Sequence, residues 1–126
     1  MKIDIGLMPQ IQLFKNKPII VPGEKIYEVL TSRHRHPIGV AVAQIRESVS
    51  HFHRRTREYY FVRRGRVEIS AGGKRFEADS DSMVYIPPKT VHCARSLGDK
   101  AEVLVISVPA WRPKDHVLAE PRLRKK

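Results

Sequence analysis

Three histidines and a glutamate have the spacing expected of ligands for one metal ion. His51 and His53 are alternate residues of a predicted strand, so both can point into one cavity while Phe52 points away. Glu58 opens a β-prone run after a polar turn, and we expect this run to lie antiparallel beside the first strand. His92 follows a strand that ends at prolines. These residues are candidate metal ligands, because imidazole nitrogens and ionised carboxylates bind divalent first-row metals. The alternative is unrelated strand histidines and an ion-paired glutamate on a polar face.

The same residues resemble a known family. The pattern His-x-His-x4-Glu-x6-Gly, followed by Pro-x4-His, is similar to the paired motifs of the cupins, which are small metal-binding β-barrels. In this sequence the pattern is formed by His51, His53, Glu58, Gly65, Pro87 and His92. The positions that depart from the family pattern lie in turns and are Ile45, Asp81, Lys89 and Ser96. The resemblance implies a metal inside a barrel, bound by the three histidines and Glu58.

A metal held in this way would keep open positions for a substrate. Four ligands leave one or two octahedral positions free, where a metal polarises a carbonyl, holds an enediolate, lowers the pKa of water or, if it is iron, binds dioxygen. We expect one divalent first-row transition metal per chain, Mn, Fe, Ni or Zn according to supply. Period two places Tyr60 on the inward face with Glu58. Tyr60 is therefore the candidate catalytic residue, and packing in the barrel wall is its alternative role.

Arginines fill the turn between two of the candidate ligands. Arg54, Arg55 and Arg57 precede Glu58, so at least one should stand near the rim of the metal cavity. Guanidinium groups bind carboxylate or phosphate through paired hydrogen bonds, which predicts an anionic substrate anchored at the mouth. The alternative is solvated charges without a ligand, because the next turn is equally rich in arginine.

The composition is that of one globular domain. With 126 residues, 41% of them hydrophobic and 29% charged, the chain suits one core, and wholesale disorder is not expected. Its single cysteine, Cys93, excludes an intrachain disulfide and favours a reducing cytoplasm. The charged start lacks the apolar region of a signal peptide, and no apolar run reaches the ~18 residues of a membrane span.

The formal net charge of +11 attracts anions of every kind. Nucleic-acid modules add a recognition helix, a zinc finger or an aromatic strand signature to such charge, and the sequence carries none of these. We therefore expect a small-molecule ligand and no membrane partner. Nucleic-acid binding by a purely structural barrel is the weakest hypothesis.

Turn residues divide the chain into short β-prone runs with almost no helical period. Gly72 and Gly73 predict a hairpin between residues 66–70 and 75–78. Other expected strands cover residues 19–21, 26–30, 38–45, 83–86 and 100–108, and one or two helical turns are expected in residues 114–120. The predicted fold is all-β: a single-domain, cupin-like double-stranded β-helix (jelly-roll) barrel. Residues 1–18 form an N-terminal arm, 19–111 the barrel, and 112–126 a short helix or extension with a basic tail.

Four further residues receive no catalytic role from the sequence. Cys93 should face away from its neighbouring histidine as a small buried apolar residue. Trp111 should cover an end of the core, with a substrate mouth as the alternative. Asp115 and His116 have no partners that the sequence can identify.

The predicted function is that of a metal-dependent enzyme acting on a small polar metabolite. The cupin resemblance implies an isomerase, dioxygenase or decarboxylase, with an anionic sugar or carboxylate among the candidate substrates. A non-catalytic small-ligand or carbohydrate-binding module is the alternative, and a catalytic acid or base beside the metal would separate the two. We also expect a homodimer, because residues 103–108 are apolar on both faces and the N-terminal arm has β-prone segments.

Overall fold

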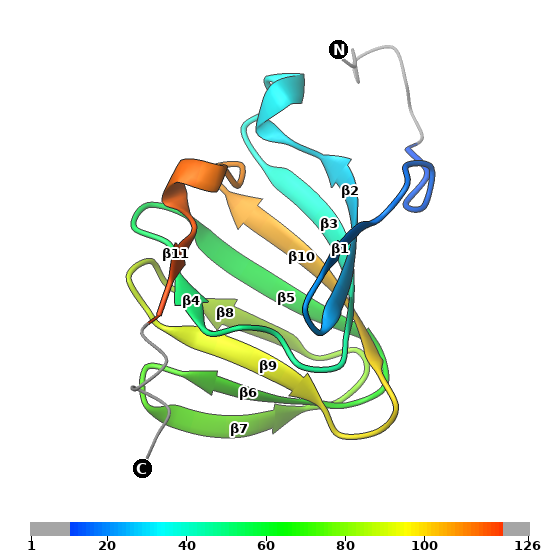
Figure 1. The fold of residues 1–126 in the computed structure, drawn as a ribbon, viewed down its shortest axis with the longest axis vertical. Coiled ribbons are helices and arrows are strands. Elements are labelled where there is room, and N and C mark those ends of the chain that lie inside the picture. Colours follow the sequence, from blue (N-terminus) through cyan, green and yellow to red (C-terminus); the bar gives the residue numbers. More distant parts are fainter. Residues whose placement is uncertain (1–10, 120–126) are drawn as a thin grey trace.

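Two antiparallel β-sheets face each other in the computed structural model, which describes residues 11–119 (Figure 1). The larger sheet has six strands in the order β1-β2-β3-β10-β5-β8, and the smaller has five in the order β11-β4-β9-β6-β7. The strands of the larger sheet are β1 (Ile19–Val21), β2 (Glu24–Leu30), β3 (Gly39–Ile45), β10 (Ala101–Val108), β5 (Arg57–Arg64) and β8 (Met83–Ile86). Those of the smaller sheet are β11 (Val117–Leu118), β4 (His51–Phe52), β9 (His92–Ser96), β6 (Val67–Ala71) and β7 (Lys74–Ala78). The predicted all-β jelly-roll architecture is confirmed.

Helix is limited to two 3-10 turns within residues 11–119, Ser32–His34 and Pro113–Asp115. Neither these turns nor any other segment in that range forms a helix of the length and apolarity that crossing a bilayer requires.

The predicted hairpin is present as β6 and β7. Ala71 and Lys74 are register partners, and the turn between them consists of Gly72 and Gly73, whose φ angles are 58° and 83°. Two successive positive φ angles suit glycine and match the twist of antiparallel strands. The local sequence therefore determines this turn.

The expected pairing of the His51 strand with the Glu58 strand is wrong. β4 pairs with β9 and β11 in the smaller sheet, whereas β5 lies between β10 and β8 in the larger sheet. The polar turn after His53 crosses from one sheet to the other, and three successive backbone amides of this turn donate to the carboxylate of Asp115. Candidate ligands therefore approach the interior from both sheets.

The C-terminal segment also differs from expectation. Instead of one or two helical turns over residues 114–120, it forms the single 3-10 turn Pro113–Asp115 and then β11. β11 pairs with β4, so that Val117 faces Phe52 and Leu118 faces His51 in the register. Pairing with an edge strand here overrides a weak helical propensity. Residues 1–10 of the predicted arm and 120–126 of the basic tail lie outside the described residues.

The core lies between the sheets and is formed by alternate strand residues. On β5, Tyr60 and Val62 are buried, while Tyr59 and Phe61 are only half-buried on the outer face. Val62 packs in a single cluster with residues such as Ile69 from the smaller sheet. Burying each such aliphatic side chain stabilises the fold by about 1.5–3 kcal/mol.

The outer face of the larger sheet is also apolar. A second cluster centred on Val42 is covered by residues of the arm, including Ile11 and Leu13. Farther along the sheet Met83 and Tyr85 of β8 are 60% and 49% exposed. This part of the face has no cover among the described residues of the chain.

We propose that a second copy of the chain covers this face. The predicted homodimer is thus placed at β8, whereas the sequence suggests it from residues 103–108 and the arm. Wild-type protein should then sediment as a dimer at micromolar concentration, and the double variant Met83→Lys/Tyr85→Lys should sediment as a monomer, because two buried charges oppose association. Phe76→Lys, at an exposed apolar position on the edge of the smaller sheet, is the matched control and should stay dimeric. A monomeric wild type would contradict the proposal.

Candidate metal centre

The four candidate ligands meet between the two sheets. His51 and His92 are register partners on β4 and β9, His53 directly follows β4, and Glu58 projects from β5 of the larger sheet. One ligand atom of each residue lies within 4.8 Å of the others, and all four residues are buried. The cluster could therefore hold one metal ion.

Backbone carbonyl groups fix the orientation of all three histidine rings. Each ring places Nδ1 at hydrogen-bond distance from a carbonyl oxygen, so Nδ1 carries the proton and donates it. The acceptors for His51, His53 and His92 are the carbonyl oxygens of Val49, Asp115 and Thr90, at 2.8, 3.0 and 2.8 Å. Each neutral ring then keeps the lone pair on Nε2 for a metal, which is the arrangement that metal-binding histidines require.

The contacts of Glu58 show that a cation fits between these residues. Oε1 of Glu58 lies 3.1 Å from Nε2 of His92 and 3.4 Å from Nε2 of His53. A lone pair repels a carboxylate oxygen at such distances unless a proton or a metal ion lies between them. Nε2 of His53 is buried and has no hydrogen-bond partner. Since an unsatisfied buried nitrogen is costly, a metal ion would satisfy the requirement of this cluster.

The electrostatics of the metal-free cluster keep His51 neutral and Glu58 ionised, which are the states that bind metals, and favour a proton on His53. Burial and, secondarily, the neighbouring His92 lower the pKa of His51 to about 3, so this ring is neutral. Burial alone raises the pKa of Glu58, but contacts with His53 and His92 outweigh it and lower that pKa below its usual range. Burial likewise lowers the pKa of His53, but the Glu58 carboxylate outweighs it and raises that pKa. Without metal, these two directions place a proton on His53 beside the ionised Glu58, and metal binding would displace that proton.

Tyr60 lies beside the cluster, as the alternation of β5 predicts. Its hydroxyl donates to Oε1 of Glu58 at 3.3 Å, and the residue is 7% exposed. Burial and then the negative charge of Glu58 raise the pKa of Tyr60, so the phenol keeps its proton. In this geometry Tyr60 orients the carboxylate, and a catalytic role stays a prediction.

The C-terminal segment braces the centre through Asp115, which sequence reasoning missed. Its carbonyl oxygen accepts from Nδ1 of His53, and its carboxylate accepts the amides of Arg54, Arg55 and Thr56 at 2.9 to 3.2 Å. Burial raises the pKa of Asp115, but these amide hydrogen bonds outweigh it and lower that pKa. Because about sixty residues separate Asp115 from this turn, no local motif signals its role.

His116 is a further imidazole at the edge of the centre. Its ring stacks on His51 with centroids 4.4 Å apart and an interplanar angle of 17°. Nε1 of Trp111 donates to Nδ1 of His116 at 3.3 Å, and burial lowers the pKa of this histidine. His116 does not belong to the four-residue ligand cluster of the described chain. No signal in the sequence distinguishes it from a solvated histidine.

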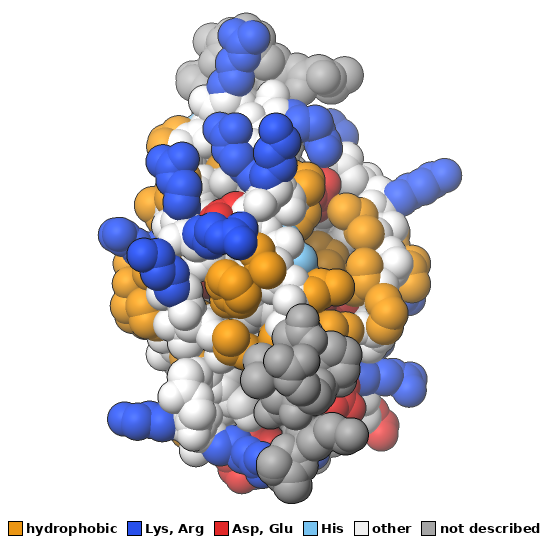
Figure 2. All heavy atoms as spheres, turned by 60° about the vertical axis from the view of Figure 1, so that its left-hand side comes forward, with side chains coloured by type: hydrophobic (Ala, Val, Ile, Leu, Met, Phe, Trp, Pro, Cys, Tyr) orange, Lys and Arg blue, Asp and Glu red, His pale blue; other side chains and the backbone are white. Residues whose placement is uncertain are grey.

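A cavity of about 630 Å³ opens above the cluster. His51, His53, Glu58 and Tyr60 contribute to its lining. Trp111 lines it as well, and its role at a substrate mouth stays a prediction. Glu24, at the start of β2, lines the same cavity and was also missed. Figure 2 shows a histidine at the bottom of an opening in the surface, with hydrophobic side chains along its edge.

The three predicted anion-binding arginines do not line this cavity. Arg54, Arg55 and Arg57 are exposed, and Arg54 lies over the ring of Phe52 at 5.9 Å from its centroid. The backbone amides of Arg54 and Arg55 rather than their guanidinium groups have the structural role in this turn. Anion binding by these side chains stays a prediction.

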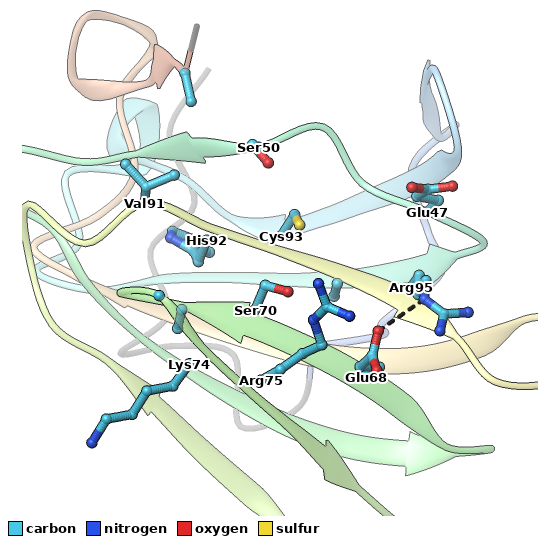
Figure 3. A pocket seen from close by; sticks show the side chains of 14 residues that line it. Glu47, Ser50, Glu68, Ser70, Lys74, Arg75, Val91, His92, Cys93 and Arg95 are labelled. Atoms are coloured by element: carbon cyan, nitrogen blue, oxygen red, sulfur yellow. Dashed lines mark hydrogen bonds and ion pairs between the residues drawn. The ribbon is translucent and has the colours of Figure 1, made fainter. Parts of the chain in front are cut away.

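A second, shallower hollow of about 570 Å³ lies on the outer face of the smaller sheet (Figure 3). Cys93 lines it, so this residue faces away from the metal cluster as expected, but it is half-buried rather than buried. An ion pair between Arg95 and Glu68, with 2.9 Å between Nε and Oε1, crosses the hollow. Part of the hydrogen-bonding capacity of the polar groups in this hollow is thus used within the hollow itself.

Comparison with known proteins agrees with this geometry. The sequence profile described as "Cupin domain" matches residues 40–109, more than half of the chain. The chain is 28% identical over 75 residues to the uncharacterized protein MJ1618 of Methanocaldococcus jannaschii, covering 59% of this chain and 60% of that protein. It is 30% identical over 78 residues to the polyketide synthase CurC of Streptomyces cyaneus, covering 61% of this chain and 51% of that protein. The matched region thus spans about half the length of these relatives.

Solved structures share the fold at low sequence identity. A protein from Planctomyces limnophilus superposes with a TM-score of 0.78 at 22% identity, covering 89% of this chain and 98% of that one. Pac13, a nucleoside dehydratase from Streptomyces, superposes with a TM-score of 0.74 at 16% identity, covering 88% and 90% of the two chains.

Replacing any of His51, His53 or His92 by Ala should greatly weaken metal binding, because no neighbour replaces the lost bond. Elemental analysis of untagged protein should find one metal per wild-type chain and much less in each variant. His36→Ala, outside the cluster, is the control and should retain metal. Stoichiometric metal in the triple histidine variant after dialysis against chelator would disprove the assignment.

Asp115→Ala should weaken metal affinity by about tenfold, because partners that orient metal ligands contribute roughly 10–100-fold. Without the carboxylate, the Arg54–Thr56 turn should loosen, and so should the hydrogen bond from His53 to the carbonyl oxygen of residue 115, while all four ligands are retained. Competition with a chelator of known affinity measures the change. Asp99→Ala, at an exposed loop position, should leave affinity unaltered; equal effects of both substitutions would contradict the bracing role.

Proposed function

The chain belongs to the cupin domain family, and on this basis we propose that it is a metal-dependent enzyme acting on a small molecule inside the barrel. The observation that carries the proposal is the convergence of Nε2 atoms and the Glu58 carboxylate at one side of the 630 Å³ cavity. Such a cluster combines metal-binding chemistry with room for a ligand. A reducing, cytoplasmic location, which the single cysteine favours, belongs to the same proposal.

A divalent metal bound there would supply Lewis-acid chemistry, polarising an oxygen atom of the substrate. The chain supplies the surroundings that make such polarisation effective. Neutral His51 and ionised Glu58 give a ligand set of low net charge. The hydroxyl of Tyr60 holds the Glu58 carboxylate in place, and the largely apolar wall lowers the local dielectric constant, which strengthens electrostatic interactions inside.

An enzyme needs a proton-transferring group that a passive binding module does not. Glu24 supplies such a group in the cavity wall. Burial, and secondarily the charge of Glu58, raise the pKa of Glu24 to about 7, where a carboxyl group both accepts and donates protons at neutral pH. This observation favours the enzyme over the non-catalytic binding module. Isomerase, dioxygenase and decarboxylase reactions are the proposed classes.

Metal-loaded protein should convert at least one small metabolite, and Tyr60→Phe should lower kcat by about 10–100-fold while retaining one metal per chain, because the Glu58 carboxylate loses its positioning donor. One panel of metabolites is assayed in three ways: NMR detects isomerised products, oxygen uptake detects dioxygenase activity, and carbon dioxide release detects decarboxylation. Tyr59→Phe, on the outer face of the same strand, is the matched control. Metabolites that bind without turnover would establish the binding module instead.

A further inference from the structure

The wall of the metal cavity is mostly apolar. Many of its side chains come from β2, β3 and β10, with Ile26, Leu30, Ile45 and Val105 among them. The described lining contains neither lysine nor arginine. A phosphate or carboxylate entering this space would lose its hydration without gaining a guanidinium or ammonium partner from the wall.

The mouth of the cavity is apolar as well. Ile19, Val49 and Leu118 line the cavity and are 45%, 39% and 62% exposed, so they form an apolar edge in contact with water. Figure 2 shows such side chains around the opening, while the Lys and Arg side chains of this view lie outside it. Apolar side chains grouped at the entrance of a pocket are typical of a binding surface.

Glu24 is one of two acidic residues of β2, with Glu28, that line the cavity in addition to the ligand Glu58. It lines the cavity, and no residue of the described chain donates a hydrogen bond to its carboxylate. Glu28, the next acidic residue on β2, has an ion-pair partner in Arg33 at 3.5 Å. Glu24 thus has unused hydrogen-bonding capacity, and a bound molecule can use it.

We infer that the cavity binds an uncharged, largely apolar molecule whose hydroxyl group donates a hydrogen bond to the Glu24 carboxylate. The inference rests on the proposed function, because it takes the cavity above the metal ligands as the substrate site. It deepens that proposal by naming the substrate class and a residue that recognises it. The apolar body contacts residues such as Ile26 and Ile45, and the oxygen-bearing end faces the cluster.

The raised pKa of Glu24, at about 7, agrees with this assignment. Burial makes a full negative charge costly at this position, and a hydroxyl donor compensates a carboxylate without bringing a second charge to desolvate. An ammonium group would pair with Glu24 but must itself be desolvated, and the Glu24 carboxylate would repel an anion placed beside it. Neutral hydroxyl compounds are therefore the favoured class.

A matched set of probes tests the inference. Benzyl alcohol, benzoate and benzylamine share one ring and differ in charge, and glucose 6-phosphate represents the phosphorylated sugars. Their dissociation constants for zinc-loaded protein are measured by ligand-observed NMR titration at moderate salt. Benzyl alcohol should bind at least about fivefold more tightly than each charged probe, because those probes pay a larger desolvation cost in an apolar cavity.

Substitutions locate the binding interactions. Glu24→Ala should weaken benzyl alcohol binding by about 5–10-fold, since one hydrogen bond to a charged group is lost, and Glu24→Gln should retain most affinity, because an amide oxygen still accepts. Ile19→Lys should weaken benzyl alcohol binding and strengthen benzoate binding by placing a cation at the mouth. Lys25→Ala, the adjacent outward-facing position on β2, is the control and should bind like wild type.

The inference is overturned if a charged probe binds most tightly, if no probe binds, or if Glu24→Ala binds benzyl alcohol like wild type. Metal content is measured on every sample, so the proposed metal-dependent function and the proposed substrate class can be rejected independently of each other. Wild-type protein that retains no zinc contradicts the proposal of a metal-dependent enzyme. The order of probe affinities still tests whether the cavity wall prefers uncharged molecules. Zinc-loaded protein with the reverse ranking contradicts the substrate class alone.

Discussion

A buried carboxylate sets the main constraint on this fold. Glu58 is 5% exposed and ionised in an interior otherwise formed by side chains such as Val62 and Ile69. An unpaired charge there would be strongly unfavourable, and His53 and His92 approach the carboxylate to 3.4 and 3.1 Å. The cluster consequently connects the two sheets at one point, and removal of one ligand affects both metal binding and packing.

The histidines depend in turn on loops that supply backbone carbonyl groups. Two of these acceptors, Val49 and Thr90, lie two residues before the histidine that they orient, so local geometry suffices for His51 and His92. His53 instead depends on Asp115, which is distant in sequence. The C-terminal segment must therefore dock before the third ring is oriented, and completion of the fold and formation of the site are coupled.

Local structure could be predicted from the sequence, whereas contacts between residues far apart in the chain could not. The β6–β7 turn and β8 follow from glycines, prolines and alternation, and the inward position of Tyr60 follows from period two. The assignment of β4 and β5 to different sheets does not, because a short polar turn permits either a hairpin or a crossing. Asp115 and Glu24 were missed because their positions depend on residues distant in sequence. Asp115 bonds to a turn about sixty residues away. Glu24 directly follows the Pro22-Gly23 turn, and the β2–β3 register, in which it pairs with Ile45, places it at the cavity.

Net charge and the cavity wall act at different distances. The formal net charge of +11 produces a field that attracts anions over several ångströms of solvent. Desolvation excludes unpaired lysine and arginine from an apolar wall, so the ionisable groups that line the cavity are carboxylates, imidazoles and a phenol. An anion attracted to the surface therefore meets an unfavourable wall over the last part of its path. In the proposed site, hydration and hydrogen bonding to Glu24 would therefore govern selection inside the barrel, and the overall charge of the chain would not.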